Sequence, residues 1–76
     1  MENVITILKE IRPGQDFSKA EDFFAQGVLD SLDLTALVAA LESRYNMFVD
    51  VDEIVPDNFR NLAAIRALLV RHGVTP

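Results

Sequence analysis

One apolar stripe constrains the fold of this chain more than any other feature. Its members recur at positions i, i+3, i+4, i+7 and i+11 of one helical face, namely Leu34, Leu37, Val38, Leu41 and Tyr45. The opposite face carries small or polar residues, namely Thr35, Ala36, Ala39, Glu42 and Ser43. This is the pattern of a helix that buries one side only. Asp30 before the stripe is a strong N-cap candidate, and Asn46 after it suits the left-handed position that often ends a helix. The pattern predicts a helix whose first residue is Ser31.

Two shorter apolar repeats predict two further main helices. The first repeat runs from about Asn3 to Arg12 and is closed by Pro13-Gly14. The second begins after Asn61, a candidate N-cap, and ends with Arg71 before Gly73. Between the stripe and the last helix, residues 51–55 predict a short turn of helix, stopped by Pro56.

A long connection precedes the best-defined helix. It extends from Gln15 to Leu29 and is polar except for five apolar residues, namely Phe17, Phe23, Phe24, Val28 and Leu29. Exposing all of them would be costly, so we expect them to hold the loop against the core. The expected fold is therefore all-α: a four-helix bundle with three main helices, one short helix and a long first loop. With 76 residues, the chain fits one small domain, residues 1–76.

Composition excludes several classes of protein. The chain has no cysteine, which removes disulfides, thiolate metal sites and thiol catalysis. Its first residues lack the pattern of a secretory signal, and its apolar runs are far too short to span a bilayer. We therefore expect a folded, cytoplasmic protein that is a monomer and has no intrinsic metal.

The charge is unevenly distributed along the chain. Residues 21–57 hold nine acids against Arg44 alone, a net charge of −8, whereas the remaining residues sum to +3 and restore the overall −5. Such a field disfavours nucleic acid and anionic membrane and favours basic protein surfaces. The alternative is that the acidic residues only maintain solubility.

Ser31 lies where the long loop meets the apolar stripe. If Asp30 accepts the amides of Leu32 or Asp33, the Ser31 hydroxyl stands free at the first helical position. A serine nucleophile requires a base within hydrogen-bond reach, but the only histidine, His72, lies at the far end of the last helix, where we expect it to be solvent-exposed. The chain also lacks a Gly-x-Ser-x-Gly elbow. Ser31 therefore has the features of an attachment point rather than of a catalytic nucleophile.

The run Gly27-Val28-Leu29-Asp30-Ser31-Leu32-Asp33-Leu34, leading into residues 37–45, resembles the phosphopantetheine site and second helix of acyl carrier proteins. The resemblance covers nearly the whole chain. It implies an acyl-carrier-type bundle and a 4′-phosphopantetheine arm on Ser31, transferred from coenzyme A by a magnesium-dependent phosphopantetheinyl transferase. Acyl or aminoacyl groups would travel as thioesters on the thiol of this arm, so a protein without cysteine could still serve thioester chemistry. The chain itself would be no enzyme.

The resemblance also implies roles for residues around Ser31. Asp30 would help to hold the magnesium ion during transfer. The partner-facing surface would include Leu32, Asp33, Ala36, Glu42, Phe48 and Glu53. Its partners would be a loading ligase and a downstream acyltransferase or synthase. A cleft for an acyl chain would lie between the second and the short helix, with four candidate lining residues, Val38, Leu41, Val49 and Ile54.

Departures from the family pattern bear on the pathway. Ala36, Ala39 and Ser43 stand where fatty-acid carriers tend to have acids, and Phe48 stands where they usually have glutamate. Phe48 either offers an apolar contact or folds into the core. The Gly-Val-Leu-Asp-Ser lead-in and residues 42–45 are closer to D-alanyl, aminoacyl or polyketide carriers, which favours a dedicated pathway.

Two readings compete with a carrier. The chain could be a small helical adaptor in which Asp30 and Ser31 are only a cap. Residues 50–53 resemble the start of a calcium loop but lack its central glycine and terminal glutamate, so a solvated acidic turn is the better interpretation.

Overall fold

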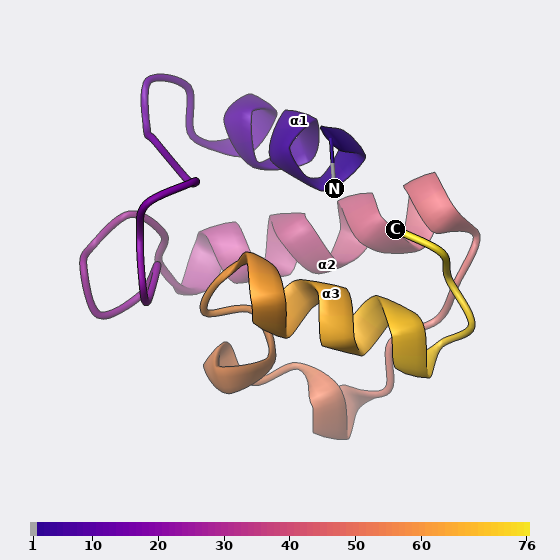
Figure 1. Ribbon diagram of the computed structural model, residues 1–76. Helices are drawn as coiled ribbons and strands as arrows, with labels where there is room; N and C mark the ends of the chain where they lie inside the picture. Colours follow the sequence, from indigo (N-terminus) through magenta and orange to yellow (C-terminus); the bar gives the residue numbers. More distant parts are fainter. Residues whose placement is uncertain (1) are drawn as a thin grey trace.

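Three α-helices form the framework of residues 2–76, the part of the chain that the computed structural model describes. Helix α1 spans Glu2–Ile11, α2 spans Ser31–Tyr45 and α3 spans Leu62–Arg71 (Figure 1). Two 3₁₀ helices, η1 at Val51–Glu53 and η2 at Pro56–Asn58, lie between α2 and α3. These residues contain no strand, so the prediction of an all-α fold with three main helices and a long first loop is confirmed.

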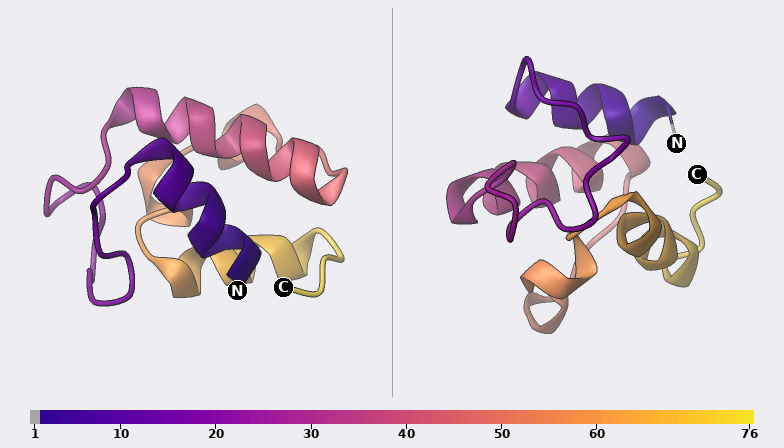
Figure 2. Two further views of the ribbon diagram at one scale, coloured as in Figure 1. Left: turned by 90° about the horizontal axis from the view of Figure 1, so that it is seen from above. Right: turned by 60° about the vertical axis from the view of Figure 1, so that its left-hand side comes forward.

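The three α-helices pack side by side and differ in direction. α1 runs antiparallel to α2, whereas α3 runs in the same direction as α2 (Figure 1). Two further views place α1 on one side of the α2–α3 pair and the segment with η1 and η2 on the other (Figure 2). As a result, α2 begins at the opposite end of the molecule from the end of α3 (Figure 1).

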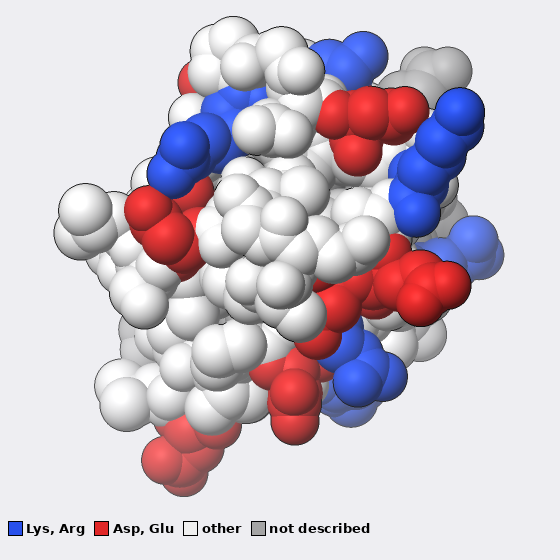
Figure 3. Space-filling view, turned by 90° about the vertical axis from the view of Figure 1, so that its left-hand side faces the viewer, with Lys and Arg blue, Asp and Glu red and all other residues white. Residues whose placement is uncertain are grey.

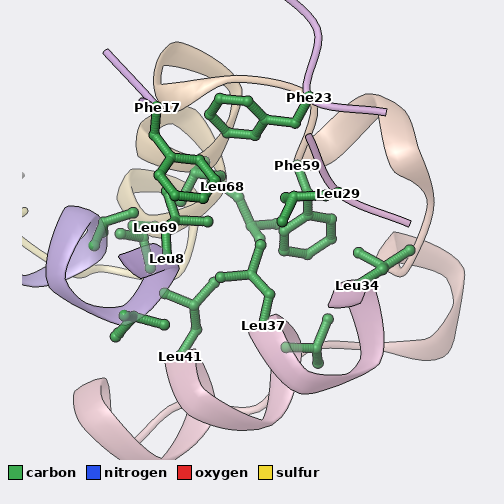
Figure 4. Close-up of a cluster of buried hydrophobic side chains, with 14 of the residues drawn as sticks. Leu8, Phe17, Phe23, Leu29, Leu34, Leu37, Leu41, Phe59, Leu68 and Leu69 are labelled. Atoms are coloured by element: carbon green, nitrogen blue, oxygen red, sulfur yellow. The ribbon is translucent and has the colours of Figure 1, made fainter. Parts of the chain in front are cut away.

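The predicted stripe of α2 forms the centre of the hydrophobic core. Leu34, Leu37, Val38 and Leu41 are buried, and Tyr45 is half-buried. Side chains from α1, α3 and the first loop converge on them (Figure 4). Outside α2, the fully buried side chains among the described residues include Val4, Leu8, Phe17, Phe23, Val49, Phe59, Ile65, Leu68 and Leu69. The stripe of α2 therefore lies at the centre of the core, where side chains from α1, α3 and the first loop meet it.

Aromatic residues hold the long loop against this core, as the sequence indicates. Phe17 and Phe23 are buried and meet edge to face, with ring centroids 5.4 Å apart (Figure 4). The Phe23 amide donates to the Arg60 carbonyl at 2.6 Å, and the side-chain amide of Asn61 donates to the Glu21 carbonyl at 3.0 Å. The loop is therefore tied to the chain just before α3 by packing and by hydrogen bonds.

The predicted helix ends are confirmed where a cap sets them. Asn46 adopts the left-handed conformation, with φ 50°, directly after α2. Asn61 caps α3 by accepting the amide of Ala64 at 2.8 Å. Each cap satisfies a local backbone requirement, which is why sequence spacing alone locates it.

The expected short fourth α-helix takes another form. Residues 51–53 make only a 3₁₀ turn, and Val55 is extended, with φ −130° and ψ 148°. A residue before proline avoids the helical region, so the turn cannot continue. Pro56 then occupies the first position of η2, where its missing N–H costs nothing. Pro56 was expected only to stop a helix, but it also starts one.

His72 is not the solvent-exposed residue that the sequence suggested. It is half-buried at the C-cap of α3, and its Nε2 lies 2.9 Å from Glu53 Oε1. This contact ties the end of α3 to η1. The end of α3, which His72 caps, lies at the far end of the molecule from the start of α2 (Figure 1).

Removing core volume from α2 should be costly, whereas the same change on its surface should not. Leu37 is 0 % exposed and Leu32 is 81 % exposed. We expect Leu37→Ala to lower the free energy of unfolding by about 2–5 kcal/mol, because a cavity is left. Leu32→Ala, the matched control, should change it by about 0.5 kcal/mol or less. Urea unfolding followed by circular dichroism measures both, and equal losses would contradict this description of the core.

Candidate functional site

Ser31 is the first residue of α2 and is exposed. Its carbonyl accepts the Thr35 hydroxyl at 3.4 Å, but its own hydroxyl has no hydrogen-bond partner among residues 2–76. The position predicted for Ser31, at the first turn with a free hydroxyl, is therefore the observed one. The hydroxyl is accessible to a second molecule.

A capping box fixes the backbone on both sides of Ser31. Asp30 Oδ1 accepts the amide of Asp33 at 3.0 Å, and Asp33 Oδ2 accepts the amide of Asp30 at 3.0 Å. Two orphan amides of the helix start are thus satisfied reciprocally. Asp30 is the N-cap that the sequence predicted, and the return bond from Asp33 completes it.

Arg12 pairs with both of these carboxylates, a contact that the sequence analysis missed. Its Nε lies 2.7 Å from Asp33 Oδ2, and its Nη2 lies 2.9 Å from Asp30 Oδ2. The hydrogen bond and charge of Asp33 raise the pKa of Arg12 above its ordinary value. The end of α1 is therefore joined to the start of α2 through the two carboxylates that lie on either side of Ser31 in the sequence. If α1 had been expected to pack antiparallel to α2, the residue after α1, Arg12, would have been expected near the acids at the start of α2.

The six predicted partner-facing residues fall into two groups. Leu32, Ala36 and Phe48 are exposed, and Phe48 keeps 71 % of its accessible surface. Of the two alternatives for Phe48, burial in the core is therefore wrong.

The three acids among these candidates have structural partners. Asp33 retains only 13 % side-chain exposure, and Glu42 Oε2 accepts the Val49 amide at 3.0 Å. Glu53 Oε1 accepts the Asp50 amide at 3.2 Å and faces His72. These carboxylates serve as acceptors within the fold, and less of their charge faces solvent than the sequence suggests.

The candidates also do not form one compact patch. Leu32 and Asp33 lie in the first turn of α2, whereas Phe48 follows its last turn. A helix of 15 residues places these ends about 20 Å apart. The structure thus brings Asp30, Leu32 and Asp33 together with Ser31, and leaves Phe48 and Glu53 at a distance.

The acyl-cleft candidates are packed side chains. Val38, Leu41 and Val49 are buried, and Ile54 packs against the core. A cavity of about 270 Å³ lies elsewhere, between α1 and α2, and its lining contains none of the four candidates. Its walls are formed by Ile7, Glu10, Ile11, Ala40, Ser43 and Arg44.

Charge on the face at which α2 begins is mixed. Acidic and basic side chains both border a broad uncharged area there (Figure 3). The described residues contain no group of three acidic or histidine side chains that could hold a metal ion. Nor does any helix within residues 2–76 have the length and apolarity needed to cross a membrane.

Because of the Asp30 cap, we expect the free energy of unfolding to fall when the pH is lowered below about 4. The Asp33 amide, assisted by Arg12, holds the pKa of Asp30 below its usual value despite partial desolvation. Such a carboxylate stabilises the fold above its unfolded pKa, near 4, and this stabilisation is lost as the pH falls through the lower, folded pKa. Asp30→Asn keeps an acceptor but cannot ionise. We expect the urea midpoint of the wild type to exceed that of Asp30→Asn at neutral pH, and the gap to close below about pH 4. A gap that is constant down to pH 2.5 would contradict this assignment.

Comparison with known families matches residues 2–69 to the family described as phosphopantetheine attachment site. A search of curated proteins and a search of solved structures gave no match. Members of this family carry a 4′-phosphopantetheine prosthetic group, act as non-catalytic carriers and are modified by a separate transferase. The match covers all three α-helices except the last two residues of α3. The chain therefore belongs to the phosphopantetheine-binding carrier family, as its resemblance to acyl carrier proteins predicted.

Proposed function

We propose that residues 1–76 form a single carrier domain in which Ser31 accepts 4′-phosphopantetheine. The observation that carries this proposal is the exposed, unpartnered Ser31 hydroxyl at the first position of α2, in a chain that matches the family. No side chain has to move to uncover this hydroxyl. The residues present therefore fit the group that the family carries.

Attachment is a phosphoryl transfer in which Ser31 is the acceptor. The Ser31 oxygen forms a bond to the phosphorus that bears the pantetheine, and adenosine 3′,5′-bisphosphate leaves from coenzyme A. The hydroxyl proton passes to a base of the transferase, because His72 caps the end of α3, which lies at the other end of the molecule from the start of α2 (Figure 1). Asp30 is 55 % exposed, so its outer oxygen can contact a magnesium ion of the transferase in place of Arg12.

The contribution of the chain is to fix one end of a tether. The capping box and Arg12 hold the backbone of Ser31, while the arm itself extends into solvent. When bound, the arm supplies a thiol that carries acyl or aminoacyl groups as thioesters. A rigid base with a flexible arm lets one carrier meet several enzymes in turn, at a high effective concentration of cargo.

We further propose a surface for a loading ligase and a downstream acyltransferase or synthase. Leu32 and Ala36 provide its apolar part beside Ser31. The outer face of α2 carries few charges, because Thr35, Ala36, Ala39 and Ser43 are exposed on it and Asp33 is paired with Arg12. This favours a dedicated aminoacyl or polyketide pathway over housekeeping fatty-acid synthesis, with a monomeric carrier in the cytoplasm. An acyl chain would shelter beside Val38, Leu41, Val49 and Ile54 only if these packed side chains separate.

The decisive experiment is modification of the purified chain. We expect coenzyme A, magnesium and a broad-specificity phosphopantetheinyl transferase to add one phosphopantetheine, detected as a single increment in intact mass. Ser31→Ala should abolish the addition. Ser43→Ala, an exposed serine on the same helix, should leave it intact.

Two outcomes would contradict the proposal. An unmodified wild type would favour the adaptor, in which the capping box is only structural. Addition to Ser31→Ala would place the arm on another residue.

A further inference from the structure

We propose that Arg12 holds the phosphate of the modified Ser31, by exchanging its contact with Asp30 for one with the phosphodiester while it keeps Asp33. This inference rests on the proposed function. Arg12, the residue directly after α1, would thereby be a positioning residue for the arm and not only an ion-pair partner.

The two contacts of Arg12 differ in burial. The Nε contact is made at 2.7 Å to Asp33, whose side chain is 13 % exposed. The Nη2 contact is made at 2.9 Å to Asp30, whose side chain is 55 % exposed. Exposed ion pairs contribute little to stability because water screens them and both side chains lose freedom. The contact with Asp33 is therefore the anchor, and the contact with Asp30 is the one that can be exchanged.

The guanidinium of Arg12 has hydrogen-bond donors that are not used within the described part of the fold. Arg12 Nη1 has no hydrogen-bond partner within residues 2–76, and the Arg12 side chain is 41 % exposed. Arginine presents its N–H groups in a planar fork that suits phosphate oxygens. A fork held at Nε by a mostly buried carboxylate is already oriented, so less rotamer entropy is lost when it binds an anion.

Charge balance supplies the reason for the exchange. In the unmodified chain, Arg12 faces Asp30 and Asp33, which leaves one net negative charge beside Ser31. A phosphodiester on Ser31 adds another negative charge next to Asp30 in sequence. Without a cation, three anions would crowd the first turn of α2, and like charges at this separation repel. Arg12 is the cation that pairs with the two carboxylates of this turn.

The test compares stability before and after modification. We expect modification to lower the melting temperature of Arg12→Gln by about 3 °C more than that of the wild type, since a screened surface interaction is lost in the modified form only. Arg12→Lys keeps the charge without the fork and should fall between them. Arg66→Gln removes an exposed arginine of α3 and should respond to modification as the wild type does.

Salt and a spectroscopic readout separate this role from a purely structural one. The extra 3 °C should shrink by at least about half in 0.5 M salt, because added ions screen the repulsion. In the wild type, the Arg12 Nε–H resonance should shift on modification and stay protected from exchange with water, whereas that of Arg66 should not shift. This second readout needs no variant, so it decides the matter even if Arg12→Gln fails to fold.

The outcomes distinguish the two proposals. If the wild type takes up no phosphopantetheine, the proposed function fails and this inference fails with it. If Ser31 is modified but the wild type and Arg12→Gln respond equally, or the Arg12 resonance does not shift, the carrier function stands and the role of Arg12 is refuted. A lower melting temperature of Arg12→Gln that is the same with and without the arm also refutes it.

Discussion

The ion pairs between Arg12 and the two carboxylates of the α2 cap are the contact on which the site depends. α1 and α2 are separated in sequence by the long first loop, and a long loop alone leaves the relative position of its ends loosely defined. Core packing brings α1 and α2 together, but it does not fix how the C-terminal end of α1 is oriented toward the first turn of α2. Arg12 does this, because Asp33 receives its Nε in a mostly buried position.

The same pattern recurs in the other acids of the middle segment. Asp33, Glu42 and Glu53 each accept a backbone amide, from Asp30, Val49 and Asp50 respectively. Each also lies where a loop meets a helix, which is where amides lack partners. A charge count along the sequence treats these residues as surface charge. These carboxylates also satisfy backbone amides, so their positions are set by the fold and not only by contact with solvent.

Sequence reasoning located what is set by neighbouring residues. The helix stripe, the N-cap at Asp30 and the left-handed Asn46 all follow from local spacing, and the structure confirms them. The contacts that it missed join distant residues: Arg12 and Asp33 are 21 positions apart, and Glu53 and His72 are 19 apart. No local pattern selects one cation among several for such a pair. Residues 51–53 form a 3₁₀ turn and not an α-helix because Val55, the residue before Pro56, is extended. The sequence analysis took Pro56 only as the end of a helix and did not consider this effect on Val55.

The free hydroxyl of Ser31 has a physical cause in its position within α2. A serine or threonine inside a helix can donate to the carbonyl four residues earlier, as Thr35 does to Ser31. The residue four positions before Ser31 is Gly27, which lies in the loop with φ 72°, so no helical carbonyl stands below the Ser31 hydroxyl. The hydroxyls of Ser31 and Thr35 lie one helical turn apart, and only the Thr35 hydroxyl donates a hydrogen bond to a helix carbonyl. The first position of α2 therefore combines a backbone that the cap fixes with a hydroxyl that has no intrahelical acceptor, and both properties suit the attachment proposed for Ser31.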